Sequence, residues 1–303
     1  MAIPTVIGVL VFLFSLTYLL PGDPASIMLG PRATPQMVAE INARLRLNEA
    51  VHIRLAHYLF GILKGELGTS VWSGRTVASL IADALPHTIL LAVCSLGFAA
   101  FLGIALGVLS SAYSQRKRGQ AVTLVSLLCV AVPDFVAALL LMLCFCVYFP
   151  LFPVIGAGES GNISDIIYHL VLPTLSLAIG WIGYLSRLSR ESMVEVLYSD
   201  YIRTAKAFAA TKRQIFYKYA LKNAIIPTIT VIGLGIGKLL GGAVFVEIIF
   251  ARPGLGRLIV DAVYARDLPV IQGGVLTASL LFILANIMAD ISYALVDPRI
   301  QYD

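Results

Sequence analysis

The chain has 303 residues, of which 59% are hydrophobic and only 13% are charged. A soluble domain carries roughly a quarter of its residues as Asp, Glu, Lys and Arg, and a disordered chain has few apolar residues. The composition therefore excludes a soluble globular protein and a disordered one, and indicates that lipid surrounds much of the chain. The formal net charge of +5 is typical of the basic cytoplasmic loops of a membrane protein, so it does not indicate nucleic-acid binding.

Apolar runs predict an all-α, polytopic membrane protein with six transmembrane helices, because a spanning helix needs about 20 largely apolar residues. The predicted spans are 3–20, 88–113, 121–149, 169–186, 224–250 and 270–296. The first span has no basic flank and no small-residue cleavage site after it, so we interpret it as a retained helix and not as a signal peptide. An even number of spans puts both termini on one side of the membrane.

The segment 21–85 mixes short amphipathic stretches with turns and is predicted to form a small folded cap on the outer face. One helix in it is predicted to start at Thr34 and Pro35. Thr is a favoured N-cap residue, and Pro is favoured at the first helical position. The chain is thus divided into a first helix (1–20), an extracytoplasmic segment (21–85) and a core transmembrane domain (86–303).

The segment 187–223 between the fourth and fifth spans is basic and contains no Pro or Gly. Its apolar residues recur at helical spacing, which fits either a helix lying on the inner leaflet or a docking surface for a soluble partner. Composition alone does not separate these two interpretations. Because basic residues concentrate in cytoplasmic loops, this segment and both termini are predicted to be cytoplasmic. Its basic residues are Arg187, Arg190, Arg203, Lys206, Lys212, Arg213, Lys218 and Lys222.

Three ionisable residues within the spans are candidates for the pore or substrate path, since charges inside a membrane are costly and usually functional. Asp134 and Lys238 both lie about 20 Å from the inner edge of their spans, at about 1.5 Å rise per residue. They form either a pair across the pore lining or two separate charges that face a water-filled cavity. Glu247, at the outer end of the fifth span, faces either an outer gate or solvent.

Small residues repeat every four positions on the fifth span, at Gly233, Gly237 and Gly241. This spacing lets helices approach closely and predicts either packing between subunits or a pore lining. Gly103 and Gly107 repeat the pattern in the second span.

The sequence contains no motif for catalysis, cofactor binding or metal binding. The nearest resemblance to a phosphate-binding loop, at 233–238, lacks the Ser or Thr that should follow Lys238 and lies in a predicted span. The four cysteines lie inside apolar runs without a metal-ligand spacing. We therefore expect a transport subunit, with no catalytic, metal or cofactor residues of its own.

Eight short motifs occur in order along nearly the whole chain. The motifs are LLPGDPA from Leu19, GELGTS from Gly65, LPHT from Leu85, DYIRTAKA from Asp200, ALKNAIIP from Ala220, FARPGLGR from Phe250, RDLPVIQ from Arg266 and DPRI from Asp297. In this order and spacing, the chain resembles the inner-membrane permease subunits of ATP-binding-cassette (ABC) importers for dipeptides, oligopeptides and nickel chelates.

The resemblance implies a bacterial inner-membrane subunit that forms half of a translocation pathway. Its implied partners are a second, related permease, two cytoplasmic ATPases and an extracytoplasmic solute-binding protein. It implies no choice of cargo among short peptides, glutathione and nickel chelates. It also favours docking for 187–223, where the family inserts a short coupling helix into the ATPase. The implied coupling residues are Asp200, Tyr201, Arg203, Thr204, Ala205, Lys206 and Ala209.

Ala209 departs from the family pattern, which usually has Gly eight residues after the motif Tyr. Gly permits a positive φ at the break between two helices, and Ala there costs stability. The loop is therefore predicted either to bend differently or to join its two helices more continuously.

Two other functions remain open from the residues alone. An ion-coupled secondary carrier would need neither an ATPase nor a binding protein, and a membrane-embedded enzyme would turn over substrate by itself.

Overall fold

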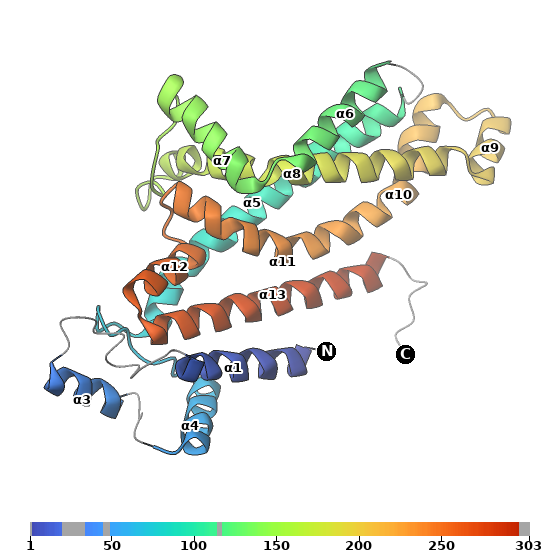
Figure 1. Ribbon diagram of the computed structural model, residues 1–303. Coiled ribbons are helices and arrows are strands. Elements are labelled where there is room, and N and C mark those ends of the chain that lie inside the picture. Colours follow the sequence, from blue (N-terminus) through green and yellow to red (C-terminus); the bar gives the residue numbers. More distant parts are fainter. Residues whose placement is uncertain (1, 20–33, 45–48, 114–116, 297–303) are drawn as a thin grey trace. The chain divides into compact units, whose positions relative to one another are not determined.

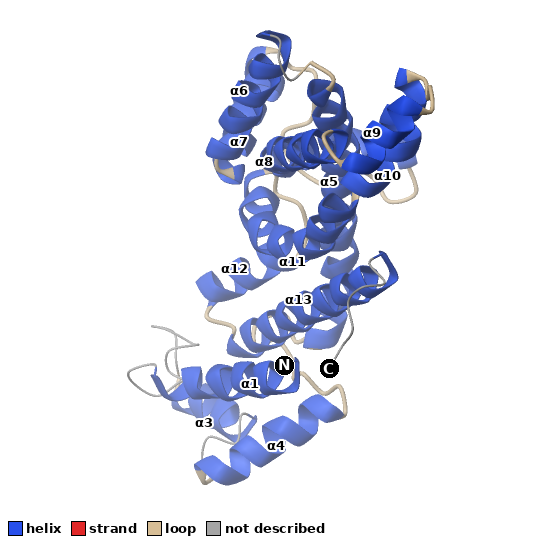
Figure 2. Ribbon diagram, turned by 90° about the vertical axis from the view of Figure 1, so that its right-hand side faces the viewer, coloured by secondary structure: helices blue, strands red, loops and turns tan. Residues whose placement is uncertain are grey.

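The computed structural model describes residues 2–19, 34–44, 49–113 and 117–296. The motif residues 20–25 and 297–300 lie outside the described residues. The described residues form helices joined by short loops, with a single isolated antiparallel bridge between Thr69 and Thr76 (Figure 2). The all-α prediction is confirmed.

The chain divides into two compact units, which we describe separately. Unit 1 comprises 1–87 and 253–283, and unit 2 comprises 88–252 and 284–303. Helices α5 (Val77–Ser111) and α13 (Leu268–Val296) contribute to both units.

Unit 1 contains α1 (Ala2–Leu19), α3 (Pro35–Arg44), α4 (Val51–Leu63) and α12 (Leu255–Ala265). The predicted start of α3 is confirmed, because the backbone N–H of Met37 donates to Thr34 Oγ1 at 3.3 Å and Pro35 is the first helical residue. Two apolar clusters hold the unit together. Their buried members are Val77, Ile81, Leu255, Ala262 and Val270 in one, and Leu10, Leu13 and Leu276 in the other.

Unit 2 contains the remaining helices, which pack around α8. Helices α6, α7 and α11 all lie against α8 in Figure 1. Their bounds are α6 Lys117–Ala131, α7 Asp134–Met142, the π-helical segment η2 Leu143–Tyr148, α8 Ile163–Leu197, α9 Asp200–Ala207, the π-helical segment η3 Gln214–Ala220, α10 Leu221–Ala224 and α11 Ile226–Ile249.

Helix α8 is the longest described helix that lies wholly in unit 2. Its 35 residues correspond to about 52 Å at 1.5 Å per residue, whereas the hydrocarbon core of a bilayer is about 30 Å thick. The helix therefore continues well beyond a membrane at one or both ends, and its last turns carry the loop that contains α9.

Four of the described helices are long and apolar enough to cross a membrane: α5, α8, α11 and the stretch Leu268–Ile291 of α13. A fifth crossing would require α6 and α7 to form one broken span. The described apolar stretch of α1, Pro4–Ser15, is shorter than a span. The structure thus supports a multi-pass membrane protein with four or five recognisable spans.

The predicted third span, 121–149, is not one straight helix. Its two halves, Gly119–Ala131 and Asp134–Tyr148, meet at an angle of 97°. Pro133 explains the break, because proline has no N–H for the carbonyl of Cys129 and disfavours helical geometry at the preceding Val132. Asp134 is the first residue after the break.

Candidate functional site

The segment predicted to dock a partner forms a compact loop at the end of α8. Helix α9 begins after Ser199 and has one fully buried side chain, Ile202. Ile202 packs into a cluster of unit 2 whose other buried members are Val108, Met193, Ile215, Ala220 and Ala224. This cluster fixes α9 to α8 and η3, so that the loop is a rigid extension of α8.

A capping motif defines the turn after α9. The N–H groups of Ala209 and Ala210 donate to the carbonyls of Lys206 and Ala205, each at 3.1 Å, which is the hydrogen-bond pattern of a Schellman motif. Ala209 occupies its left-handed position with φ 56°. The chain therefore bends at Ala209, and the prediction of two more continuous helices is wrong. The hydrogen bonds of the motif hold Ala in the conformation that Gly usually adopts.

The next helical segment is capped in turn. Thr211 Oγ1 accepts from the N–H of Gln214 at 3.3 Å, and Gln214 Oε1 accepts from the N–H of Thr211 at 2.9 Å. This reciprocal pair is a capping box. The loop is also fastened to α10, because Asn223 Nδ2 donates to the Tyr201 hydroxyl at 2.8 Å.

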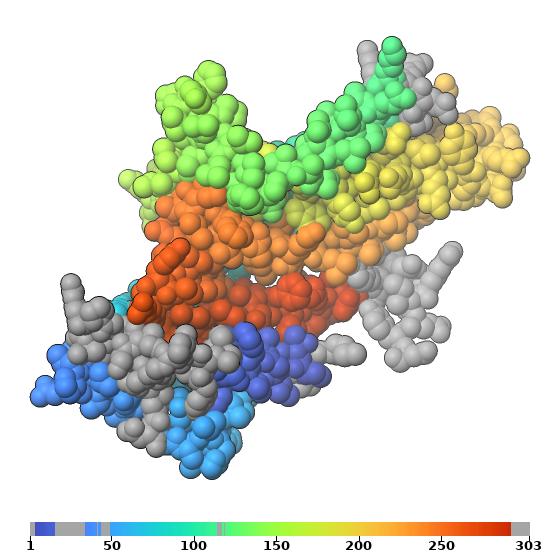
Figure 3. Space-filling view, in the orientation of Figure 1, coloured from blue at the N-terminus to red at the C-terminus, as the bar shows by residue number. Residues whose placement is uncertain are grey.

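Several side chains of α9 face outward. Asp200 and Arg203 are largely exposed and pair with each other at 3.2 Å, and Phe208 at the end of the helix is 83% exposed. Atoms of this segment form an outer end of unit 2 in Figure 3. These exposed charges and Phe208 are the part of this segment that a partner could contact. Sequence reasoning missed Phe208, although it directly follows the DYIRTAKA motif.

A second site is a buried charge cluster at the end of α11. Glu247 and Arg252 are both fully buried, so of the two positions considered for Glu247, the one facing solvent is wrong. Glu247 accepts a hydrogen bond of 2.5 Å from Thr88 Oγ1 of α5, and its backbone oxygen accepts from the N–H of Arg252 at 2.8 Å. The sequence did not reveal this contact because Thr88 is 159 residues away.

Arg252 has a definite partner in α8. Its Nη1 donates to the carbonyl of His169 at 3.5 Å. Pro173, four residues later, cannot donate to that carbonyl within the helix, so Arg252 satisfies an acceptor that proline leaves open. Within the described part of the chain, Nε and Nη2 of Arg252 have no hydrogen-bond partner. Burial lowers the pKa of the Arg252 guanidinium, and the charge of Glu247 opposes this shift.

Asp134 and Lys238 lie near each other in unit 2 but do not touch. Lys238 lies one helical turn before Gly242, which packs against the Asp134 carboxylate, yet the described residues include no Lys238–Asp134 ion pair within 4 Å. Lys238 is exposed and Asp134 is partly buried. The contact expected for a closed ion pair is thus not formed in this conformation.

The glycine repeats have different surroundings. A methyl carbon added at Gly103 would lie 2.8 Å from Leu185 Cβ, and one at Gly107 would lie 2.5 Å from the oxygen of Ser186. These two glycines therefore allow α5 and α8 to pack closely within this chain. On α11, Gly237 is buried, whereas a methyl carbon at Gly241 would meet nothing within 4 Å among the described residues.

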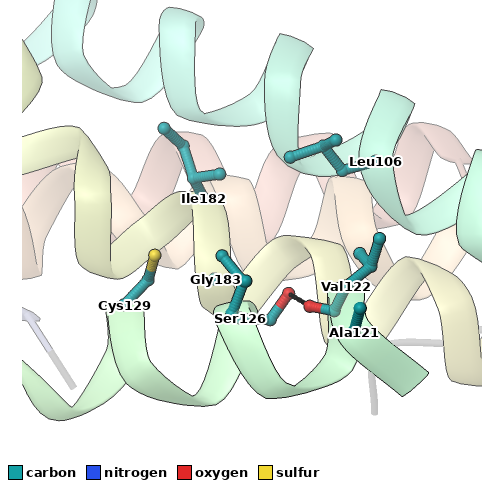
Figure 4. Close-up of a pocket in the computed structure, with 8 residues that line it drawn as sticks. Leu106, Ala121, Val122, Ser126, Cys129, Ile182 and Gly183 are labelled. Atoms are coloured by element: carbon teal, nitrogen blue, oxygen red, sulfur yellow. Dashed lines mark hydrogen bonds between the residues drawn. The ribbon is translucent and has the colours of Figure 1, made fainter. Parts of the chain in front are cut away.

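An apolar pocket of about 200 Å³ lies between α5, α6 and α8 (Figure 4). Its lining includes one hydroxyl, that of Ser126, which donates to the carbonyl of Val122 at 2.8 Å. The described lining contains no charged side chain, so the pocket does not suit a charged solute. Its lining residues are Leu106, Ala121, Val122, Val125, Ser126, Cys129, Ile182 and Gly183.

Comparison with known proteins assigns the chain to a family. Residues 103–302 match the sequence model of the binding-protein-dependent transport system inner membrane component, and residues 1–92 match the N-terminal model of such membrane components. The chain belongs to this family. It is the permease subunit of an ABC importer and not an enzyme, and the family resemblance expected from the motifs is confirmed.

Relatives of this permease match it over almost their full length. It is 38% identical to a probable peptide ABC transporter permease protein, y4tP, of Sinorhizobium fredii, over 99% of this chain and 96% of the relative. The glutathione transport system permease protein GsiC of Salmonella typhi is also 38% identical, with the same coverage. The dipeptide transport system permease protein DppB of Escherichia coli is 36% identical over 100% of this chain and 96% of the relative.

A solved structure shares the fold. The MetNI methionine ABC transporter in an inward-facing conformation has a chain that matches 72% of the permease described here and 96% of its own length, with a TM-score of 0.60 and 18% identity. Permeases of this family work with ATPase subunits and with solute-binding proteins.

Proposed function

We propose that this permease forms half of an ATP-driven pathway for short peptides or other peptide-sized solutes, which a binding protein delivers. The relatives named above, which are named for peptide, dipeptide and glutathione transport, support this choice of cargo. Nickel chelates are the less favoured cargo, because none of these three relatives is named for nickel transport. The second half of the pathway is a related permease, so that the core is a heterodimer.

The proposed topology has six spans with both termini in the cytoplasm. The first helix (1–20), an extracytoplasmic cap (21–85) and the core (86–303) are its parts, and the broken pair α6 and α7 provides one crossing. The glycines at 233, 237 and 241 serve helix packing, and the open surface at Gly241 suits contact with the partner permease.

The loop 187–223 is proposed as the coupling element, and the rigid attachment of α9 to the end of α8 is the observation that carries this assignment. A closing motion of two ATPases requires a stiff element that transmits it. Ile202 and the two capping motifs supply that stiffness. The outward-facing residues of Asp200–Ala207, with Phe208, supply the contact surface.

Crosslinking in intact cells tests the proposal. A cysteine introduced as Thr204→Cys should crosslink to an ATP-binding subunit, whereas Ile163→Cys, at the opposite end of α8, should not. Uptake of a labelled dipeptide by reconstituted transporter should require ATP and be blocked by vanadate. Uptake that persists with vanadate and depends on an ion gradient would instead establish a secondary carrier.

The proposed substrate path includes Asp134 and Lys238. Glu247 is proposed to act as a buried support near the outer end of α11, because its carboxylate binds Thr88 and is closed to solvent.

A further inference from the structure

The break between α6 and α7 occurs where a membrane-spanning helix should be continuous. The backbone leaves helical geometry at residues 132 and 133, inside an apolar stretch, and the two helices meet at 97°. Irregular backbone at membrane depth is tolerated only where protein buries it or where it lines a water-filled cavity. In secondary transporters, discontinuous helices commonly form the solute site, and the same physical reason applies to a broken span here.

Asp134 is the first residue after this break, and its carboxylate lies next to two glycines. A methyl carbon at Gly242 of α11 would lie 2.7 Å from Asp134 Oδ2, and one at Gly180 of α8 would lie 3.7 Å from Oδ1. The carboxylate therefore lies against glycines of two other helices, and any larger residue at Gly242 would displace it.

Among the described residues, none donates a hydrogen bond to the Asp134 carboxylate. The Asp134 carboxylate oxygens are also not fully buried, because they are absent from the buried side-chain atoms that lack a hydrogen-bond partner. A ligand or water can therefore reach them. Lys238, one helical turn before Gly242, brings a positive charge to the same region of α11 without forming an ion pair with Asp134. The Asp134 carboxylate is partly buried, is reachable from outside and accepts no hydrogen bond from the described residues. It can therefore bind a cationic group.

We infer that Asp134 binds the α-ammonium group of the solute as it passes through the permease, with Lys238 nearby for the solute carboxylate. This inference rests on the proposed function, since it assigns a role within a peptide pathway. Gly180 and Gly242 have no side chains, so the Asp134 carboxylate fits between α8 and α11 in its observed position. Because Asp134 and Lys238 do not pair directly, a zwitterion can bind between them.

The first test needs no knowledge of the cargo. Val132→Cys is introduced at the break in a chain whose four native cysteines are replaced by alanine. The assembled transporter is then treated with 2-aminoethyl methanethiosulfonate, a cation, or with the anionic 2-sulfonatoethyl reagent. The ratio of cation to anion reaction rates should fall roughly five- to ten-fold when Asp134→Asn is added, because a carboxylate a few ångströms away attracts one reagent and repels the other. No reaction with either reagent, or an unchanged ratio, would overturn the inference.

The second test measures transport. In reconstituted transporter with loaded binding protein, Asp134→Asn should lower uptake of radiolabelled L-alanyl-L-alanine per ATP hydrolysed by about ten-fold, the loss expected for a charged hydrogen bond. Asp134→Glu should restore most of it. Gly242→Ala should reproduce the loss by displacing the carboxylate, whereas Gly97→Ala, where a methyl carbon meets nothing within 4 Å among the described residues, should not.

A structural role for Asp134 gives a different result. The melting temperature of the substrate-free transporter should be the same with Asp134→Asn as with the native residue. A fall of several degrees together with the loss of uptake would make Asp134 a structural charge and overturn the inference. Absence of ATP-driven uptake in the native transporter would count against the proposed function, while the thiol test would still decide the cation site.

Discussion

The positive φ of Ala209 gives the sharpest prediction about the coupling loop. Left-handed geometry costs an L-residue about 1–2 kcal/mol, and glycine avoids this cost but loses about 0.4–1 kcal/mol through its greater freedom when unfolded. Ala209→Gly should therefore stabilise the loop by about 0.5–1 kcal/mol. The capping hydrogen bonds from the N–H groups of residues 209 and 210 should then open less often.

Hydrogen exchange followed by mass spectrometry measures this change. Exchange of the amides in 205–214 should slow by roughly two- to five-fold in Ala209→Gly, since each 1.4 kcal/mol corresponds to a factor of ten. Ala207→Gly is the matched control, because Ala207 lies in the last turn of α9 with helical geometry. That substitution should instead speed exchange by a similar factor.

Opposite signs from the same substitution two residues apart are the decisive result. If both variants sped exchange, the left-handed turn at Ala209 would be wrong. Transport and ATPase docking should survive Ala209→Gly, because the bend already has the geometry that glycine prefers. A complete loss of complex assembly would contradict the placement of the coupling helix.

Three further substitutions follow from contacts in unit 2. Phe208→Ala should weaken ATPase binding by about 1–3 kcal/mol, measured by co-purification. It should not lower the melting temperature, measured by calorimetry. Binding equal to that of the native permease would show that Phe208 does not contact the ATPase. Arg252→Met should destabilise the transporter by about 1–3 kcal/mol, because it removes the donor to the partly buried His169 carbonyl, which Pro173 cannot satisfy. Arg252→Lys should cost less, and an unchanged melting temperature would contradict this role of Arg252. Gly107→Ala should lower the free energy of unfolding by about 1–3 kcal/mol, because the added methyl group would push α5 away from α8. Gly97→Ala should be neutral or slightly stabilising. Equal effects of the two substitutions would refute the close packing of α5 and α8.

Local signals predicted the local structure well. The cap at Thr34 and the start of α3 at Pro35 follow from residue preferences within one turn, and the structure has both. The family resemblance predicted a short helix within the loop 187–223, without its bounds, and it identified Ala209 as the departure from the family pattern. Its outcome was not predicted, because hydrogen bonds from flanking residues decide whether Ala tolerates a positive φ.

Long-range contacts were not predictable from a single sequence. Glu247 has the sequence position of a helix end facing solvent, and only the folded chain brings Thr88 and Arg252 to it. The break at Pro133 was hidden because both halves of the stretch 121–149 are apolar, and hydropathy does not report direction. Equal depth for Asp134 and Lys238 was inferred from rise per residue, which fixes height but not whether two side chains meet.

The length of α8 has a mechanical consequence. A rod of about 52 Å that is firmly attached to α9 at one end converts a small tilt into a large displacement. A tilt of about 10° about a point near the middle of the rod moves the tip by about 4–5 Å, close to the pitch of about 5.4 Å of a helix. With the proposed docking of α9 on the ATPases, a modest movement there would be transmitted to the opposite end of α8, near the point where Arg252 meets the His169 carbonyl.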